Sequence, residues 1–145
     1  MEIRRVTPDE LPDWLRLRHA LWPDHTSASH LAEMQGILND PGCAVFVAVS
    51  PDGNLVGFLE AGLRKSAEGC DTSPVGYIEG WYVDPAYQRQ TAGRQLVGAT
   101  EAWARQQGCS EIASDCLIDN QVSLEAHLSL GYEEVERLIH FRKRL

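Results

Sequence analysis

The chain has 145 residues, of which 43% are hydrophobic, and its 21 acidic against 13 basic residues give a formal net charge of −8. That length supports one substantial core, so we expect a single domain over residues 1–145. A negative field repels phosphate backbones and attracts cations, which excludes nucleic acid as an expected partner and favours a cationic one. Acidic surfaces also serve solubility alone, so the charge does not establish a substrate.

Cysteine spacing and hydropathy narrow the class further. The four cysteines form no C-x-x-C pair, the spacing typical of zinc and redox sites, so we expect reduced thiols and no metal. Charge precedes any apolar run at residues 1–5, which does not resemble a leader peptide. No stretch approaches the roughly 20 apolar residues that span a bilayer. We therefore expect a cytoplasmic protein without a membrane segment.

The first forty residues predict a strand and two helices. A short strand at 1–6 precedes a helix start in which Thr7 is the cap and Glu10 completes a capping box. The helix should end just before Pro23, because the residue preceding a proline is driven out of the α region. A second helix is expected at 27–39.

The middle of the chain predicts three strands. Two apolar runs, at 44–49 and 55–63, are separated by a Pro-Asp-Gly-Asn turn, which is typical of a hairpin. Another strand should span 75–83. Within it, Gly80 weakens the strand and indicates a bulge.

The last third predicts two helices and three strands. An apolar stripe marks a helix at 93–107 that ends at Gly108. A short strand at 111–115 precedes a helix that Asn120 caps and that ends at 130–131. Two closing strands are expected at 132–136 and 138–144.

The turn between the strand at 75–83 and the helix at 93–107 is a candidate phosphate site. A strand-to-helix turn presents unpaired backbone NH groups at the positive end of a helix dipole, and both features suit a pyrophosphate. Most such turns bind nothing, so the geometry alone leaves this open.

The same segment resembles the acetyl-CoA signature of the GNAT superfamily of N-acetyltransferases. Its pattern V-x-P-x-[YF]-[QR]-x-x-G-x-[GA] is matched by Val83, Pro85, Tyr87, Gln88 and Gly93, with Thr91 where a first glycine is usual. The resemblance implies an α/β GNAT fold, in which helices flank both faces of a mixed, splayed sheet. It also implies acetyl-CoA as co-substrate, with these binding residues: Trp81, Tyr82, Val83, Gln88, Arg89, Gln90, Thr91, Ala92, Gly93, Arg94 and Asn120.

Within that superfamily, short motifs spread along the chain resemble the short aminoglycoside 6'-N-acetyltransferases. They include Leu21-Trp22-Pro23, Gly69-Cys70-Asp71 and Glu79-Gly80. The resemblance implies an antibiotic-resistance enzyme, commonly a homodimer, that acetylates the 6'-amine of an aminoglycoside. It places these residues around the acceptor: Trp22, His25, Glu79, Asp115 and Glu136.

Glu79 is the acid with the strongest local argument. Strand alternation predicts that Glu79, Trp81 and Val83 share one face. A carboxylate among apolar strand neighbours needs a partner, either a structural arginine or a substrate ammonium. Asp115 and Glu136 follow or end strands, where ligand groups often lie, and both could equally be solvated.

Direct transfer requires a proton acceptor for the amine and a donor for the departing thiolate. Glu79 or Asp115, directly or through water, is the candidate acceptor. His127 precedes Gly131 by the spacing at which many GNAT enzymes carry a tyrosine acid, so it is the candidate donor, although a helix histidine more often simply packs. Two alternatives remain: acetylation of a polyamine or protein N-terminus, and a non-catalytic acyl-CoA-binding module.

Overall fold

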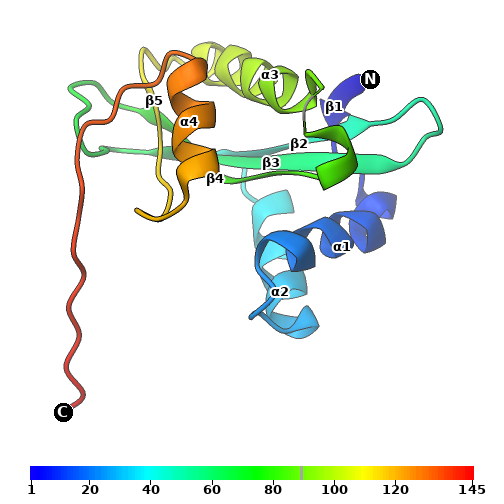
Figure 1. Cartoon of the computed structure of the whole chain (residues 1–145), viewed down its shortest axis with the longest axis horizontal. Coiled ribbons are helices and arrows are strands. Elements are labelled where there is room, and N and C mark those ends of the chain that lie inside the picture. Colours follow the sequence, from blue (N-terminus) through cyan, green and yellow to red (C-terminus); the bar gives the residue numbers. More distant parts are fainter. Residues whose placement is uncertain (89) are drawn as a thin grey trace.

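The computed structural model describes residues 1–88 and 90–145, and in them one mixed sheet has the strand order β1-β2-β3-β4-β5 (Figure 1). The first four strands pair antiparallel, and β5 runs parallel to β4. The strands are β1 (Glu2–Arg5), β2 (Cys43–Val49), β3 (Leu55–Arg64), β4 (Val75–Val83) and β5 (Ile112–Ser114). The helices are α1 (Leu11–Leu21), α2 (Ser27–Leu38), α3 (Ala92–Gln106) and α4 (Gln121–Ser129), with 3-10 turns η1 (Pro8–Glu10) and η2 (Pro85–Tyr87).

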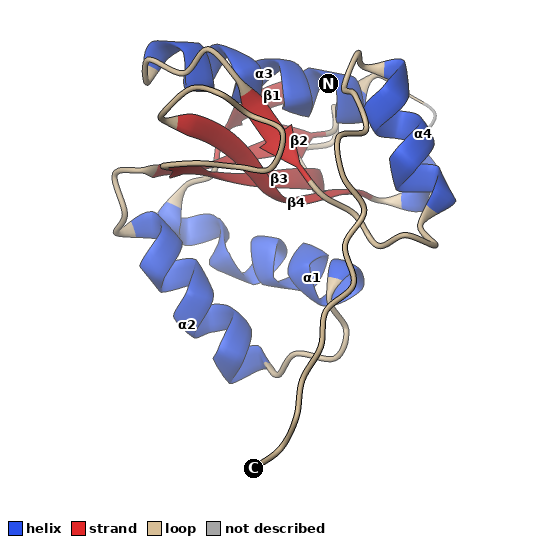
Figure 2. Ribbon diagram, turned by 90° about the vertical axis from the view of Figure 1, so that its left-hand side faces the viewer, coloured by secondary structure: helices blue, strands red, loops and turns tan. Residues whose placement is uncertain are grey.

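Helices cover both faces of the sheet, as the sequence predicts (Figure 2). The alternation within β2 separates two cores. Val45 and Val47 join Trp14 and Met34 under α1 and α2, whereas Phe46 lies in the opposite core under α3. The predicted apolar stripe of α3 is buried there, and its residues are Leu96, Val97, Thr100, Trp103 and Ala104.

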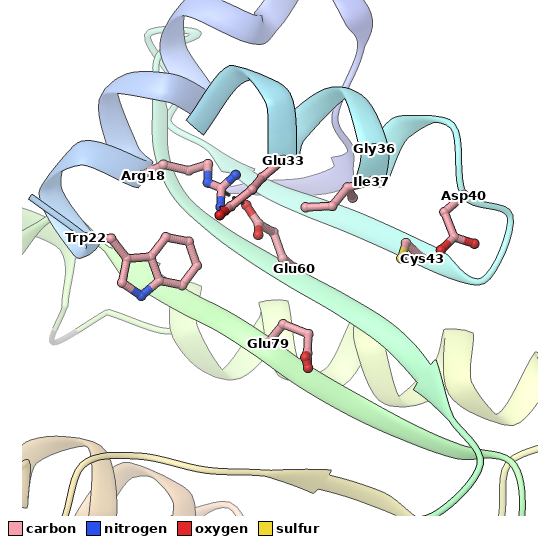
Figure 3. A pocket seen from close by; sticks show the side chains of 9 residues that line it. All are labelled: Arg18, Trp22, Glu33, Gly36, Ile37, Asp40, Cys43, Glu60 and Glu79. Atoms are coloured by element: carbon pink, nitrogen blue, oxygen red, sulfur yellow. Dashed lines mark hydrogen bonds and ion pairs between the residues drawn. The ribbon is translucent and has the colours of Figure 1, made fainter. Parts of the chain in front are cut away.

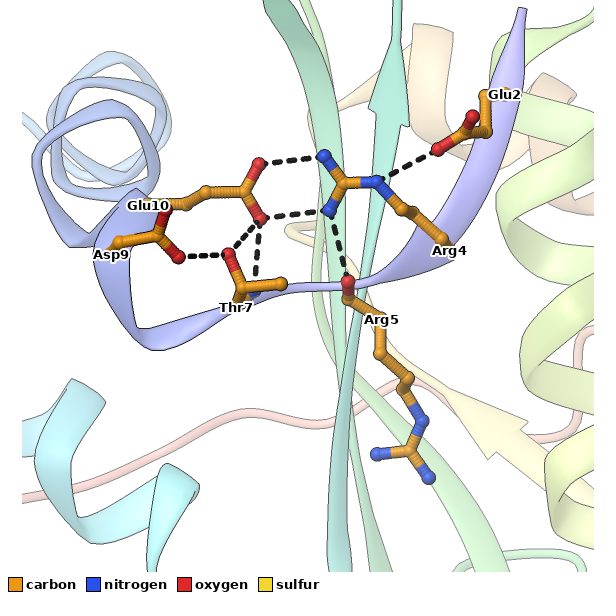
Figure 4. A network of polar contacts seen from close by, with 6 residues as sticks. All are labelled: Glu2, Arg4, Arg5, Thr7, Asp9 and Glu10. Atoms are coloured by element: carbon orange, nitrogen blue, oxygen red, sulfur yellow. Dashed lines mark hydrogen bonds and ion pairs between the residues drawn. The ribbon is translucent and has the colours of Figure 1, made fainter.

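The expected capping box forms at Thr7 and Glu10, but it opens the 3-10 turn η1, and α1 begins after it. The Thr7 amide donates to Glu10 Oε1 at 2.8 Å. The same carboxylate receives both terminal nitrogens of Arg4 at 2.8 Å, which ties β1 to the start of the helical layer (Figure 4). The Arg4 guanidinium lowers the pKa of Glu10 to about 2, so the pair is charged at neutral pH.

A bulge interrupts the pairing of β3 and β4, at the position that Gly80 indicates. Glu60 lies opposite Gly80 and Ala61 lies opposite Ile78, so Glu79 has no opposing residue in the register. The extra residue reverses the alternation of side chains along the strand. The expectation that Glu79 and Trp81 share a face is therefore wrong: Glu79 lines a cavity with α1 and α2 residues, whereas Trp81 packs against the α3 core.

The same part of β4 separates from β5. Their parallel pairing covers only Gly76 to Ile78 on β4, and beyond it β4 pairs with β3 alone. The final five residues of β4, 79–83, thus form an open edge inside the sheet. This is the splayed sheet that the sequence resemblance implies.

The two closing strands predicted at 132–136 and 138–144 are absent from the chain, which the structure describes throughout this segment. Residues 132–145 run as an extended tail away from the sheet (Figure 1). The alternation that suggested strands is real, but a strand requires a partner, and none lies beside the tail within the described chain. Tyr132 at its start is partly buried and donates its hydroxyl to Glu101 Oε2 at 2.9 Å. The side chains that follow are exposed, with Ile139 at 76% and Phe141 at 92%.

Gly80 should be intolerant of a side chain, because a Cβ there would lie 2.4 Å from the Trp22 ring. We expect Gly80→Ala to lower the free energy of unfolding by about 1–3 kcal/mol, the usual cost of overpacking. Urea denaturation followed by circular dichroism measures it. Gly98→Ala is the control: nothing lies within 4 Å of its Cβ position, so the helix should gain about 0.5–1 kcal/mol. Equal effects at both sites would contradict the packing argument.

Candidate active site

A cavity of about 410 Å³ lies between the sheet and the α1–α2 layer (Figure 3). Four of its nine lining residues are acidic and one is basic. The lining residues are Arg18, Trp22, Glu33, Gly36, Ile37, Asp40, Cys43, Glu60 and Glu79. The excess of carboxylates gives the cavity a negative potential, which attracts ammonium groups.

The innermost acid of this cavity is Glu60, which sequence reasoning missed. The residue is only 3% exposed, and its Oε2 accepts the Trp14 indole NH at 2.9 Å. Arg18 Nε lies 3.3 Å from the same oxygen, and Arg18 also donates to Glu33 at 2.5 Å. Burial raises the pKa of Glu60 to about 7, although Arg18 and the Trp14 hydrogen bond act in the opposite direction.

Glu79 and Asp115 are joined by a chain of contacts through two residues that the sequence did not single out. Arg64 donates to Glu79 Oε2 at 2.8 Å and stacks over the Tyr77 ring at 3.4 Å. The Tyr77 hydroxyl donates to Asp115 Oδ2 at 2.5 Å. Burial and this hydrogen bond raise the pKa of Tyr77, which keeps the hydroxyl protonated as a donor. Arg64 is thus the structural arginine that one interpretation of Glu79 required.

The structure brings together some of the predicted acceptor residues and separates others. Trp22 and Glu79 line the same cavity. His25 lies just beyond Trp22, with its ring 5.4 Å from that of His30. Asp115 is exposed after the end of β5, and Glu136 is exposed on the extended tail outside the cavity lining. Register and hydrogen bonding, which no single-residue pattern reveals, decide these positions.

The predicted acetyl-CoA residues lie on the open part of β4 and at the start of α3. Trp81 packs against Gly93, where a Cβ would lie 3.3 Å from the indole ring. The Trp81 indole nitrogen is buried and has no hydrogen-bond partner in the described part of the chain. A buried donor without an acceptor is costly, and a ligand carbonyl or phosphate would satisfy it.

The turn that precedes α3 also offers donors to an anion. Gln88 is fixed by donating its side-chain amide to the Val83 carbonyl at 3.0 Å. Thr91 is the N-cap of α3 but makes no side-chain capping bond, so the first NH groups of the helix keep their binding capacity. Arg89 lies outside the described residues. Asn120 is further along the chain, where its side chain caps α4 by accepting from the Ser123 amide at 3.1 Å.

His127 lies beside the open strand and is held at both ring nitrogens. Its Nδ1 lies 2.7 Å from the Ser123 carbonyl oxygen, an acceptor only, so Nδ1 carries the proton. Nε2 lies 2.8 Å from the Ser114 hydroxyl, which then donates to it. The ring meets Trp81 edge to face at 5.3 Å. These contacts favour a packed histidine that supports the Trp81 ring.

In residues 1–88 and 90–145, no group of three or more His, Cys, Asp or Glu side chains is arranged to hold a metal ion. Over the same residues, no helix is both long and apolar enough to cross a membrane.

Comparison with known proteins places this arrangement in a family. The Acetyltransferase (GNAT) family matches residues 9–132. The chain belongs to the GNAT acetyltransferase family. The open end of β4 and the uncapped start of α3 are therefore the candidate acetyl-CoA site, and the acidic cavity on the α1–α2 side is the candidate acceptor site.

Among GNAT relatives, several are alike over their full length. An aminoglycoside N(6')-acetyltransferase type 1 of Stenotrophomonas maltophilia is 43% identical, with 99% of this chain and 93% of that protein covered. One of Salmonella enteritidis is 40% identical, with 99% of each covered. The structure of AAC(6')-Iy in complex with the bisubstrate analog CoA-S-monomethyl-acetylneamine has a TM-score of 0.93 and 39% identity, covering 99% of this chain and 98% of that one.

Two roles of His127 can be distinguished by mutation: packing that supports the Trp81 ring, and general acid catalysis. We expect His127→Ala to lower the free energy of unfolding by about 1–3 kcal/mol, because hydrogen bonds of Ser114 and Ser123 lose their partner. The fall in kcat should stay below about tenfold. Thermal denaturation and steady-state kinetics measure the two effects. A kcat reduced by about 10²-fold or more at unchanged stability would instead assign His127 the role of general acid.

Proposed function

We propose that this chain is an acetyl-CoA-dependent aminoglycoside 6'-N-acetyltransferase, formed by residues 1–145 as one domain and acting in the cytoplasm. The observation that carries the proposal is the acidic cavity beside the open end of β4, where four carboxylates face one guanidinium. An aminoglycoside presents several ammonium groups, which such a cavity attracts. The full-length similarity to aminoglycoside N(6')-acetyltransferases supports the same substrate class.

The acceptor would be held by charge and by an aromatic surface. Glu79 and Asp115 bind ammonium groups, and Arg64 and Tyr77 fix the orientation of these two carboxylates before the substrate arrives. Trp22 offers its ring to a sugar face from the cavity wall. Pre-ordered carboxylates lose little entropy on binding, so more of their electrostatic attraction contributes to affinity.

The co-substrate would lie along β4 and the start of α3. Trp81 and Val83 turn their backbone NH groups to the open edge, and the Trp81 indole supplies a further donor. Tyr82 lies between them in the phase that bonds β3, which is the phase of Asp84, whose amide donates to the Val56 carbonyl. The amides at Gly93 and Arg94 face the pyrophosphate at the positive end of α3. When bound, acetyl-CoA supplies the thioester carbon that the acceptor amine attacks. Backbone donors at the open edge stabilise the oxygen that becomes negative during that attack.

A homodimer is part of the proposal, and the tail supports it. Residues 133–145 are extended and exposed, and Val135, Ile139 and Phe141 share one face of that segment. β5 is an edge strand of only three paired residues. Two copies would satisfy both features if the tail of each paired with the sheet edge of the other. Glu136 lies on this tail, so its role in acceptor binding depends on that assembly.

Two other acceptors fit the cavity chemistry, a polyamine and a protein N-terminus. A thiol-release assay over a panel of amines, with acetyl-CoA in excess, tests the proposal directly. We expect aminoglycosides bearing a 6'-amine to be consumed with the highest kcat/KM, and analogues with a 6'-hydroxyl to be inert. A preference for spermidine or a peptide amine would assign the chain a polyamine or a protein N-terminus as its acceptor instead. Binding of CoA without turnover of any amine would favour a non-catalytic module.

Removing charge from the acceptor site should weaken acceptor use and spare acetyl-CoA binding. For Glu79→Gln and Asp115→Asn, we expect kcat/KM for a tetra-amine aminoglycoside to fall by up to about fivefold each, because both carboxylates are exposed and an exposed charge pair contributes about 0.2–1 kcal/mol. The dependence of KM on salt should also flatten, because screening acts on charge pairs. Calorimetry with acetyl-CoA is the control and should be unchanged. Wild-type kcat/KM in both variants would remove the chemical basis of the cationic acceptor.

The proposed dimer requires the apolar face of the tail to remain apolar. Phe141→Asp places a charge on the apolar face of the tail, and the mass in solution should fall from about twice 16.1 kDa to 16.1 kDa. Light scattering after size exclusion measures it. His140→Asp adds the same charge on the opposite face of the extended segment and should leave the dimer intact. A wild-type chain that is monomeric at micromolar concentration would refute the assembly.

A further inference from the structure

Glu60 is a buried carboxylate at the inner wall of the acceptor cavity, and the roles proposed above leave it without a function. It lies on β3 opposite Gly80, next to the bulge that exposes Glu79. Its two polar contacts, with Trp14 and Arg18, both use Oε2. Oε1 takes part in neither contact, and the residue lines the cavity shared with Trp22 and Glu79 (Figure 3).

The other carboxylates near the acceptor are already engaged with partners that lie outside the cavity wall or at its surface. Both oxygens of Glu79 are hydrogen-bonded by Arg64. Asp115 holds the Tyr77 hydroxyl. Each of these two carboxylates thus already accepts hydrogen bonds from a neighbouring side chain, and its negative charge can attract an ammonium ion. Glu33 is half exposed and is paired with Arg18.

The surroundings of Glu60 differ from these because the residue is only 3% exposed. Arg18 on α1 is the nearest cation, Glu33 on α2 and Glu79 on β4 are the nearest anions, and Trp14 donates a neutral hydrogen bond. Burial outweighs the attraction of Arg18 and raises the pKa of Glu60 to about 7. A proton acceptor is most effective when its pKa lies near the working pH, because it is then both ionised and basic.

We propose that Glu60 is the catalytic residue that accepts the proton from the 6'-ammonium of the acceptor, a role that rests on the function proposed above. An N–H bond of the ammonium breaks, and an O–H bond forms at Glu60 Oε1. The freed lone pair forms the new C–N bond while the C–S bond of the thioester breaks. The second nitrogen proton passes to the leaving thiolate, which becomes the thiol of CoA. Glu60 then releases the first proton to solvent.

The test is Glu60→Gln, which keeps the oxygen that accepts from Trp14 and removes the basic site. The wild-type kcat/KM should rise with pH through about 7, because only ionised Glu60 accepts the proton. Glu60→Gln should lower kcat by about 10²-fold or more. It should also abolish the rise of kcat/KM with pH, which is the pH limb assigned to Glu60. The pH profile should be measured with two aminoglycosides whose 6'-amines differ in basicity. A limb that belongs to Glu60 keeps the same midpoint with both substrates, whereas a limb that belongs to the amine shifts with its pKa.

Glu33→Gln is the matched control, since it removes the other carboxylate bound to Arg18, and it should retain the limb. Infrared titration of isotope-labelled carboxyl groups in the unloaded protein gives a second measurement. The assignment is supported if the wild type shows a carboxyl midpoint near 7 and Glu60→Gln abolishes it. If that variant does not fold, the assignment is supported when the wild-type midpoint coincides with the midpoint of the kinetic limb. An active wild type without the limb, a midpoint at the ordinary value of a glutamate, or an unchanged kcat in Glu60→Gln overturns it. Failure of the proposed function is distinct: the wild type would then turn over no aminoglycoside.

Discussion

The single extra residue in β4 is the constraint on which both halves of the site depend. Without it, Glu79 and Trp81 would point to the same side of the sheet. With it, Glu79 faces the cavity under α1 and α2, and Trp81 faces α3. Because β4 also leaves β5 after Ile78, a ligand on the open edge can meet groups from both layers. In the proposed function, acceptor and co-substrate would therefore approach one strand from opposite faces.

The acidic cavity is shaped by arginines as much as by carboxylates. Arg18 is nearly fully buried, and it stacks on Trp22 at 4.9 Å while contacting Glu33 and Glu60. Arg64 has the corresponding position outside, against Glu79. A buried charge without a partner destabilises a folded protein, so Arg18 is needed to balance the buried Glu60. Arg64 pairs with Glu79 at the surface, where the same requirement is weaker. The remaining excess of negative charge is what a polycationic substrate would neutralise.

Much of the fold could be predicted from local signals. The capping box at Thr7, the turn at Gly53 and the α3 stripe each depend on neighbours in sequence, and the structure confirms them. The face of Glu79 could not be predicted, because the phase of a strand after a bulge depends on its partner strand. Arg64 and Glu60 were missed for the same reason, since they meet β4 only through strand register. The tail has the alternation of a strand, but its state depends on an edge that lies outside its own sequence.

Thr91 shows how a departure from a family pattern can be judged from geometry. Glycine at such a position is required when the backbone adopts a positive φ or when a ligand must approach the backbone closely. Thr91 has φ −80° and ψ 0°, which an ordinary residue adopts without strain, so the first reason does not apply. Its hydroxyl makes no capping bond to the helix, and a hydroxyl can donate to a phosphate oxygen. Threonine at this position therefore imposes no backbone strain and adds one hydroxyl donor at the start of α3.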